Sequence, residues 1–274
     1  MLIVVWSVRE ALLQRLELAH RSLGEQGPHL LILHGMFGHG GNWRSVASRL
    51  ADRFQIHLPD LRNHGASPHS ADMNYPSMAE DIAAFCERLG VSEVHVIGHS
   101  MGGKVAMWFA LNYPLLVKTL IVVEMAPARY PYRFKRIFRA LREIPLAQLK
   151  ARQEADSFMA KWLDDRTLRQ FLLQNLSKDQ DGYRWRVNLD YLEQAMPLLA
   201  SFPESEAVAP FTGATLFIAG EHSDYLAEPY RYDIARLFPH SRLVTLRQAS
   251  HWPHVEQAEN FLQSVSFFYS RQNA

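Results

Sequence analysis

The fold of this chain is decided by the stretch VHVIGHSMGGK, which spans residues 94–104. Its first part, Val94–Ile97, is apolar and mostly β-branched, as expected of a buried strand. Residues Met101–Asn112 are predicted to form a helix, because Tyr113 and the proline that follows it end the helical pattern. Ser100 lies on the turn between these elements, inside the pattern G-x-S-x-G. A strand, a tight turn with a central serine and a helix are typical of a nucleophile elbow.

The two glycines of this pattern have a steric purpose. We expect a Cβ atom at Gly98 or Gly102 to collide with the neighbouring strand and helix. The turn exposes the serine hydroxyl and directs the N–H groups that follow it to the same point. A glycine-rich turn whose serine only caps the helix is the alternative for so short a pattern. The strand before it, the helix after it and suitable partner residues elsewhere favour a catalytic Ser100.

The composition is that of a globular protein with a large core. Of the 274 residues, 48% are hydrophobic and 21% are charged, which is ordinary for a soluble protein. The net charge of +1 provides no overall field that would attract nucleic acid. The single cysteine, Cys86, excludes an intrachain disulfide and fits a reducing compartment, so we expect a cytoplasmic protein.

The N-terminal residues 1–13 precede the first predicted strand. Their apolar run, Met1–Trp6, is too short to cross a membrane and lacks the basic segment and cleavage site of a signal peptide. We therefore expect an N-terminal extension, or an upstream choice of start codon, and no stable membrane insertion.

Strand and helix patterns alternate along most of the chain. An edge strand is expected near Leu16–Leu18, and later strands are expected at Leu30–Leu33, Phe54–Pro59, Val117–Val123, Ala214–Gly220 and Ser241–Leu246. Repeated strand–helix units predict a mostly parallel sheet with helices on both faces.

The alternation stops between residues 128 and 206, which are helix-like and richer in charge. We interpret this segment as an inserted helical cap, and residues 1–127 with 207–274 as the core. Its basic residues between Arg129 and Arg152 fit either a solvated helix face or a surface that attracts an anionic leaving group such as coenzyme A. Its aromatic residues fit either an acyl pocket or the core of the cap: Phe134, Phe138, Phe158, Trp162 and Phe171.

A nucleophilic serine needs a base, and the base needs an acid that orients it. After a nucleophile elbow the expected chain order is acid and then histidine. His251 lies in a loop between the last predicted strand and the closing helix, so we prefer it to His254, which lies at the helix start. Two acids, Glu124 and Asp224, follow neighbouring strands. Glu124 could instead brace the hinge of the cap, and Asp224 could cap a turn.

An oxyanion hole requires backbone N–H groups aimed at the developing negative charge. We expect one from Met101, directly after the nucleophile, and one from Met36 in the glycine-rich loop HGMFG at 34–38. Phe37 and Trp252, which lie next to these groups and to the base, are predicted to contact the substrate.

These motifs resemble the α/β-hydrolase superfamily and, more narrowly, YbfF-type bacterial esterases and related mitochondrial abhydrolase-domain proteins. The resemblance is carried by HGMFG at 34–38, DLRNHG at 60–65, GHSMGGK at 98–104, Ala126-Pro127 with Tyr130, and ASHW at 249–252. It implies an α/β-hydrolase fold with an inserted cap, and an enzyme that cleaves carboxylic esters or thioesters without a metal or cofactor.

The resemblance also bears on the acid. Members of this group usually carry aspartate at the position of Glu124, where it serves as the triad acid, and usually lack an acid in the later loop, where this chain has Asp224. We therefore predict Glu124 as the acid and keep Asp224 as the alternative.

The predicted reaction is hydrolysis of short- to medium-chain acyl esters or thioesters, acyl-CoA included, through an acyl-enzyme. A carbon–carbon hydrolase, an acyltransferase with the same triad, or a non-catalytic binding module on this fold are the alternatives. A serine at the elbow argues against dehalogenase and epoxide-hydrolase chemistry, which places an aspartate there.

Overall fold

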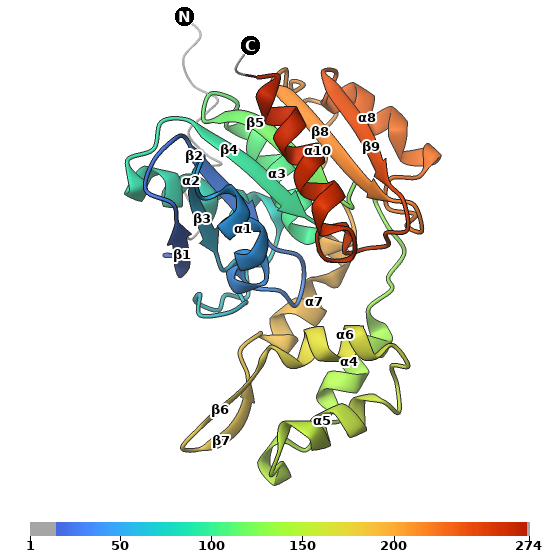
Figure 1. The fold of residues 1–274 in the computed structure, drawn as a ribbon. Helices are drawn as coiled ribbons and strands as arrows, with labels where there is room; N and C mark the ends of the chain where they lie inside the picture. The colour runs from blue at the N-terminus through green and yellow to red at the C-terminus, as the bar shows by residue number, and fades with distance from the viewer. Residues whose placement is uncertain (1–14, 273–274) are drawn as a thin grey trace, which may run out of the picture.

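A computed structural model describes residues 15–272, so the predicted extension at residues 1–13 lies outside the described part. Within that part, seven strands form one sheet with the order β1-β3-β2-β4-β5-β8-β9, in which β1 alone runs antiparallel to its neighbour (Figure 1). The predicted architecture is confirmed. The strands are β1 (His20–Leu23), β2 (His29–Leu33), β3 (Gln55–Pro59), β4 (Val94–His99), β5 (Val117–Val123), β8 (Ala214–Gly220) and β9 (Ser241–Leu246).

Helices cover both faces of this sheet. Successive residues of a strand point to opposite faces, so Leu31 and Leu33 of β2 join one hydrophobic cluster while Leu30 and Ile32 join the other. Helices α2, α3 and α8 pack on the first face, and α1 and α10 pack on the second. These core elements are η1 (Gly40–Trp43), α1 (Arg44–Leu50), α2 (Tyr75–Leu89), α3 (Met101–Asn112), η3 (Glu228–Tyr230), α8 (Arg231–Leu237), α9 (Pro253–Glu256) and α10 (Ala258–Ser270).

The first strand lies later than expected. Leu16 and Leu18 are buried, but they precede β1, which begins at His20. Leu16 N–H donates to the carboxylate of Asp81 rather than to a neighbouring strand. The apolar alternation at this point therefore marks the burial of an irregular segment.

Between β5 and β8 the chain leaves the sheet and builds a separate layer on one side of it (Figure 1). This layer is mostly helical, as predicted, and it also includes an antiparallel hairpin that the sequence pattern did not indicate. The hairpin turns at Gln180-Asp181, and Gly182, the first residue after the turn, has a φ of 115°, which glycine adopts without steric cost. The elements are α4 (Lys135–Arg142), η2 (Leu146–Gln148), α5 (Arg152–Met159), α6 (Arg166–Leu173), β6 (Leu176–Asp179), β7 (Gly182–Trp185) and α7 (Leu189–Leu199).

The candidate functional residues follow neighbouring parallel strands. The HGMFG loop follows β2, Ser100 follows β4 and Glu124 follows β5, and these three strands are adjacent in the sheet. The carboxyl ends of parallel strands meet at one edge, which is where such sheets bind ligands.

Among the described residues, no helix has the length and apolar character required to cross a bilayer.

Candidate active site

Ser100 occupies a strained turn between β4 and α3. Its backbone has a φ of 52° and a ψ of −119°, which non-glycine residues rarely adopt. The steric expectation for the two glycines is confirmed. A Cβ atom at Gly98 would lie 2.3 Å from the carbonyl oxygen of Gly102, and one at Gly102 would lie 2.4 Å from the carbonyl oxygen of Leu33. Only glycine allows the strand and the helix to approach this closely.

His251 connects Ser100 with Glu124. Its Nε2 lies 3.1 Å from Ser100 Oγ, and its Nδ1 lies 3.4 Å from Glu124 Oε2. The imidazole can therefore accept the serine proton on one nitrogen while the carboxylate faces the other. The three residues come from the loops after β4, β5 and β9, and the fold brings them together across 151 positions of sequence.

The carboxylate of Glu124 is fully buried and is fixed by the loop after β8. Gly220 N–H donates to Oε1 at 2.5 Å, and the Ser223 hydroxyl donates to Oε2. Glu124 itself takes a φ of 58°, so the chain turns sharply where β5 ends. Fixed donors and a strained backbone compensate for the longer side chain and direct one oxygen to His251.

Asp224, the alternative acid, lies elsewhere. Its carboxylate accepts two hydrogen bonds from the Arg133 guanidinium, at 2.8 Å and 2.6 Å, and is largely exposed. These hydrogen bonds hold the pKa of the Asp224 carboxyl below its usual value. Of the two acids, Glu124 is the one whose carboxylate faces Nδ1 of His251, at 3.4 Å.

The other histidines near Ser100 have supporting contacts. His99 Nε2–H donates to the carbonyl oxygen of His251 at 2.8 Å and so fixes the loop that carries the base. The ring of His254 stacks on Trp43 with the ring centroids 4.0 Å apart. Burial lowers the pKa of His254 to about 3 and that of His99 well below its usual value, so both rings are neutral at pH 7.

Two neutral histidines shape the HGMFG loop. His34 Nδ1–H donates to the carbonyl oxygen of Gly35, and its Nε2 accepts the N–H of Leu61. His64 Nε2 accepts the N–H of Phe37 at 3.2 Å. Burial lowers the pKa of His34 to about 4 and that of His64 to about 3, which keeps both acceptors unprotonated.

This bracing decides which amides can face an oxyanion. The N–H of Phe37 donates to His64 and that of Gly38 donates to the carbonyl oxygen of Gly35, so neither is available to an oxyanion. Met36 lies between Gly35 and Phe37 in the same loop and stays the predicted donor. Met101 is the first residue of α3, and the first N–H groups of a helix have no acceptor within it. The loop runs beside the nucleophile, since a Cβ at Gly35 would lie 3.1 Å from Ser100 Cβ.

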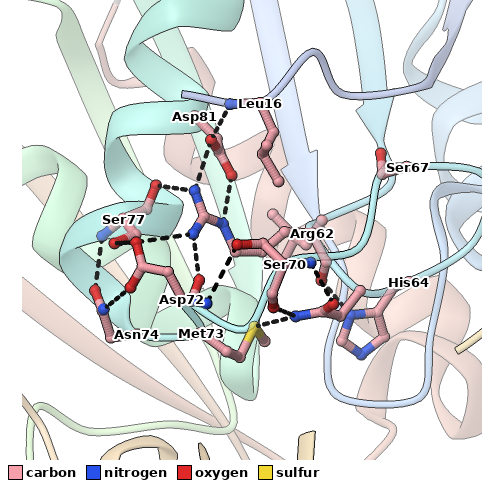
Figure 2. A network of polar contacts seen from close by, with 12 residues as sticks. Leu16, Arg62, His64, Ser67, Ser70, Asp72, Met73, Asn74, Ser77 and Asp81 are labelled. Atoms are coloured by element: carbon pink, nitrogen blue, oxygen red, sulfur yellow. Dashed lines mark hydrogen bonds and ion pairs between the residues drawn. The ribbon is translucent and has the colours of Figure 1, made fainter. Parts of the chain in front are cut away.

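A buried arginine holds the segment that carries His64 (Figure 2). Arg62 donates to both oxygens of Asp81, at 2.7 Å and 2.8 Å, and also reaches Asp72 and Ser77. Asp60 and Arg62 lie two positions apart, and an ion pair between them is the interpretation that their sequence spacing suggests. Asp60 instead accepts the N–H groups of Gly40 and Ala66, while Arg62 bonds to α2. Both sets of contacts fix the loop after β3 in place.

A cavity of about 230 Å³ opens above Ser100 and His251. Phe37 and Trp252 line it, as do Met36 and four apolar residues from the layer between β5 and β8: Phe134, Ile137, Leu168 and Phe171. Phe138, by contrast, is buried in the hydrophobic core, and Phe158 and Trp162 pack against that core. The predicted acyl-pocket aromatics are thus divided between the cavity and the core.

Sequence reasoning missed two contacts of the site. The ring of Tyr225 packs on His251 with centroids 4.5 Å apart, and Ser223 binds the acid as described above. Both residues lie in the loop after β8, beside Asp224. Their positions after a core strand placed them at the correct edge, but no pattern in the sequence distinguishes a stacking tyrosine or a bonding serine from ordinary loop residues.

These features are accompanied by a match to a known family. A profile of the alpha/beta hydrolase fold matches residues 28–258, and the chain belongs to this family.

Similar proteins are esterases and lipases. The chain is 35% identical over 250 residues to the sn-1-specific diacylglycerol lipase ABHD11 of Mus musculus, covering 88% of this chain and 80% of that protein. It is 32% identical over 237 residues to esterase YbfF of Escherichia coli, covering 86% and 91%. A solved marine microorganism esterase superposes with a TM-score of 0.90 and 41% identity, covering 92% and 99%. The predicted resemblance and the prediction of a hydrolytic enzyme are confirmed.

Proposed function

We propose that this protein is a serine esterase in which Ser100, His251 and Glu124 form the catalytic triad. The observation that carries the proposal is the position of the His251 ring, within 3.1 Å of the serine hydroxyl on one side and 3.4 Å of the buried carboxylate on the other. Nucleophile, base and acid in this arrangement support acyl transfer.

The reaction proceeds in two steps. Ser100 Oγ attacks the ester carbonyl while His251 Nε2 takes its proton, and the N–H groups of Met36 and Met101 stabilise the oxyanion. His251 then protonates the departing alcohol, which leaves an acyl group on Ser100. Water, deprotonated by the same ring, attacks the acyl carbonyl and releases the acid. The mechanism uses no metal or cofactor.

The cavity supports a small apolar substrate. About 230 Å³ is enough for a short or medium acyl chain but small beside the usual range of ligand pockets, roughly 300–1,000 Å³. We propose carboxylic esters of this size as substrates, with Phe37 and Trp252 among the contacting residues. We also propose that residues 128–206 act as a cap on the core of residues 1–127 and 207–274, because side chains from this segment wall the cavity.

Coenzyme A thioesters are less favoured by the charges of the cap. Arg133, Arg139 and Arg142 are each paired with carboxylates, and Arg139 also lies 3.7 Å from the ring centroid of Trp162. A paired, exposed arginine offers little attraction to a distant phosphate. This arrangement supports a solvated helix face.

The experiment is a panel of 4-nitrophenyl esters of increasing acyl length, assayed with the wild-type protein and with Ser100→Ala. We expect kcat/KM to be highest for short chains and to fall for long ones, and Ser100→Ala to lose essentially all turnover. Residual turnover of a tenth or more, as an order of magnitude, in the alanine variant would refute a nucleophilic Ser100.

A further inference from the structure

The wall of the cavity carries one permanent charge. Among the described residues that line it, Arg133 is the only lysine or arginine, and no aspartate or glutamate is present. Burial lowers the pKa of the lining residues His34, His99 and His254, so they are uncharged at pH 7. The interactions of Arg133 with its neighbours therefore determine the net charge that a substrate meets at this wall.

Arg133 is occupied by a residue from outside the cavity. Asp224 does not line the cavity. Its two carboxylate oxygens accept hydrogen bonds from the two terminal nitrogens of the Arg133 guanidinium, at 2.8 Å and 2.6 Å. Two parallel bonds of this kind fix the plane of the guanidinium as well as its charge. The guanidinium carbon also lies 5.5 Å from the ring centroid of Tyr225, and that ring packs on His251. The ring of Tyr225 thus contacts both Arg133 and the base, His251.

We propose that Asp224 is a specificity-determining residue, which neutralises Arg133 at the cavity wall and makes the site select uncharged esters over esters that bear a carboxylate. This inference rests on the proposed esterase function. It assigns a purpose to the acid that the triad does not use.

The cavity wall has a different electrostatic effect on a substrate with and without Asp224. A substrate carboxylate near an unpaired guanidinium gains about 1 kcal/mol at 4 Å even in bulk water, which is roughly a five-fold gain in binding, and it gains more beside apolar walls. With Asp224 in place, the substrate carboxylate meets an Arg133–Asp224 pair that has no net charge, and the carboxylate of Asp224 repels it. Removing the charge of Asp224 converts the wall into an anion-binding one.

The experiment uses matched ester pairs that differ only in charge. For the alcohol side these are 4-carboxyphenyl butyrate and 4-carbamoylphenyl butyrate. For the acyl side they are the monophenyl ester of adipic acid and that of adipamic acid. The quantity measured is the ratio of kcat/KM for the anionic ester to kcat/KM for its neutral partner, in which a general loss of activity cancels.

Asp224→Asn, which keeps the size of the side chain, is expected to raise this ratio about five-fold or more for at least one pair. Arg133→Gln is expected to lower it, because Asp224 is then left as an unbalanced anion. The double variant should return near the wild-type ratio. The gain in Asp224→Asn should shrink when ionic strength is raised.

Asp190→Asn is the matched control. Asp190 pairs with Arg142 at 2.7 Å, and that pair is exposed to a similar degree, 69% and 43% against 59% and 42%, but neither residue lines the cavity. For Asp190→Asn, the ratio of kcat/KM for the anionic ester to kcat/KM for the neutral ester should equal that of the wild type.

Two results overturn the inference while the esterase function stands: a ratio in Asp224→Asn that matches the wild type for both pairs, or a gain that persists unchanged in high salt. A wild-type protein that hydrolyses none of the four esters would refute the proposed function, and the inference with it.

Discussion

Glu124 has a backbone conformation that glutamate seldom adopts, at a φ of 58°, and every oxygen of its buried carboxylate has a donor. These constraints explain how glutamate can stand where the resemblance led us to expect aspartate. The extra methylene is accommodated because Gly220 and Ser223 hold the carboxylate from the β8 side.

This geometry leads to a prediction for the acid. Glu124→Gln keeps the shape but replaces the acceptor that orients His251, so kcat for a neutral ester should fall by about 10³–10⁴-fold. Asp224→Asn should retain far more activity on the same ester, since both carboxylate oxygens of Asp224 bind Arg133, whereas Glu124 is the acid that faces Nδ1 of His251. Steady-state kinetics of the two variants check this, and a collapse of kcat in Asp224→Asn alone would reverse the assignment.

The sequence indicated that Ser100 and His251 act together, because each lies in a motif at a typical position along the chain, and the structure places the two side chains 3.1 Å apart. The sequence could not separate Glu124 from Asp224 by itself. Both acids follow core strands at the same edge, and the choice depends on the direction of side chains, which is set by the positive φ at Glu124 and by Arg133. Arg133 lies 91 residues before Asp224, so its contact with that residue leaves no local pattern.

At the level of elements, α3 does more than expose the nucleophile. Lys104, four residues after Ser100, is buried, and its Nζ donates to the carbonyl oxygens of Ala200 and Ser201 at the end of α7. The ring of Tyr130 lies 4.9 Å away. The nucleophile helix is therefore tied directly to the segment through which the chain returns to the sheet.

Lys104 makes stability depend on pH. Burial lowers the pKa of its ammonium to about 7 from 10.5. Between these values the folded state has released the proton while the unfolded state still holds it, so the free energy of unfolding should rise with pH from about 7 upward. The slope from one proton is about 1.4 kcal/mol per pH unit.

Urea unfolding of the wild type and of Lys104→Met at pH 7 to 9 measures this contribution. The variant should lack the rise, whereas Lys118→Met, which alters an exposed lysine paired with Glu93, should keep it. Identical slopes in the wild type and Lys104→Met would contradict the account of the buried ammonium.

The elements themselves were predicted well where their apolar runs are long. Strands β2, β3, β4, β5 and β8 appear close to their predicted bounds because strands buried on both faces have continuous apolar sequences. Strand β9 also lies at its predicted bounds, although it is a mostly exposed strand at the edge of the sheet. The short, polar hairpin β6–β7 and the exposed edge strand β1 were missed or misplaced, because exposed strands lack that signal.

For the whole molecule, buried neutral histidines set the response to acid. Burial lowers the pKa of six histidines below the usual 6.5. The pKa is lowered well below 6.5 for His99, and to about 3 or 4 for the other five: His34, His57, His64, His95 and His254. Between pH 6.5 and 4 these histidines are protonated in the unfolded chain but neutral in the folded protein. The free energy of unfolding should therefore fall as the pH falls from 6.5 toward 4.

The contribution of one histidine can be isolated at His95, which lies outside the site and contacts the Thr119 hydroxyl at 2.7 Å. His95→Gln keeps a polar partner for Thr119 and should lower the slope of unfolding free energy against pH by about 1.4 kcal/mol per unit between pH 5 and 6. Chemical denaturation at several pH values gives both slopes. A wild-type stability that is flat over this range would refute the acid response.

In the proposed mechanism, the loops, the cavity and the triad all serve one covalent step at Ser100. Intact-protein mass spectrometry after incubation with a fluorophosphonate tests it most directly, because the probe requires a serine activated by its base. We predict the mass of one phosphonyl group per chain, located on the peptide that contains Ser100, absent from Ser100→Ala and strongly slowed in His251→Ala. An unlabelled wild-type protein, or a label that persists in Ser100→Ala, would contradict the account.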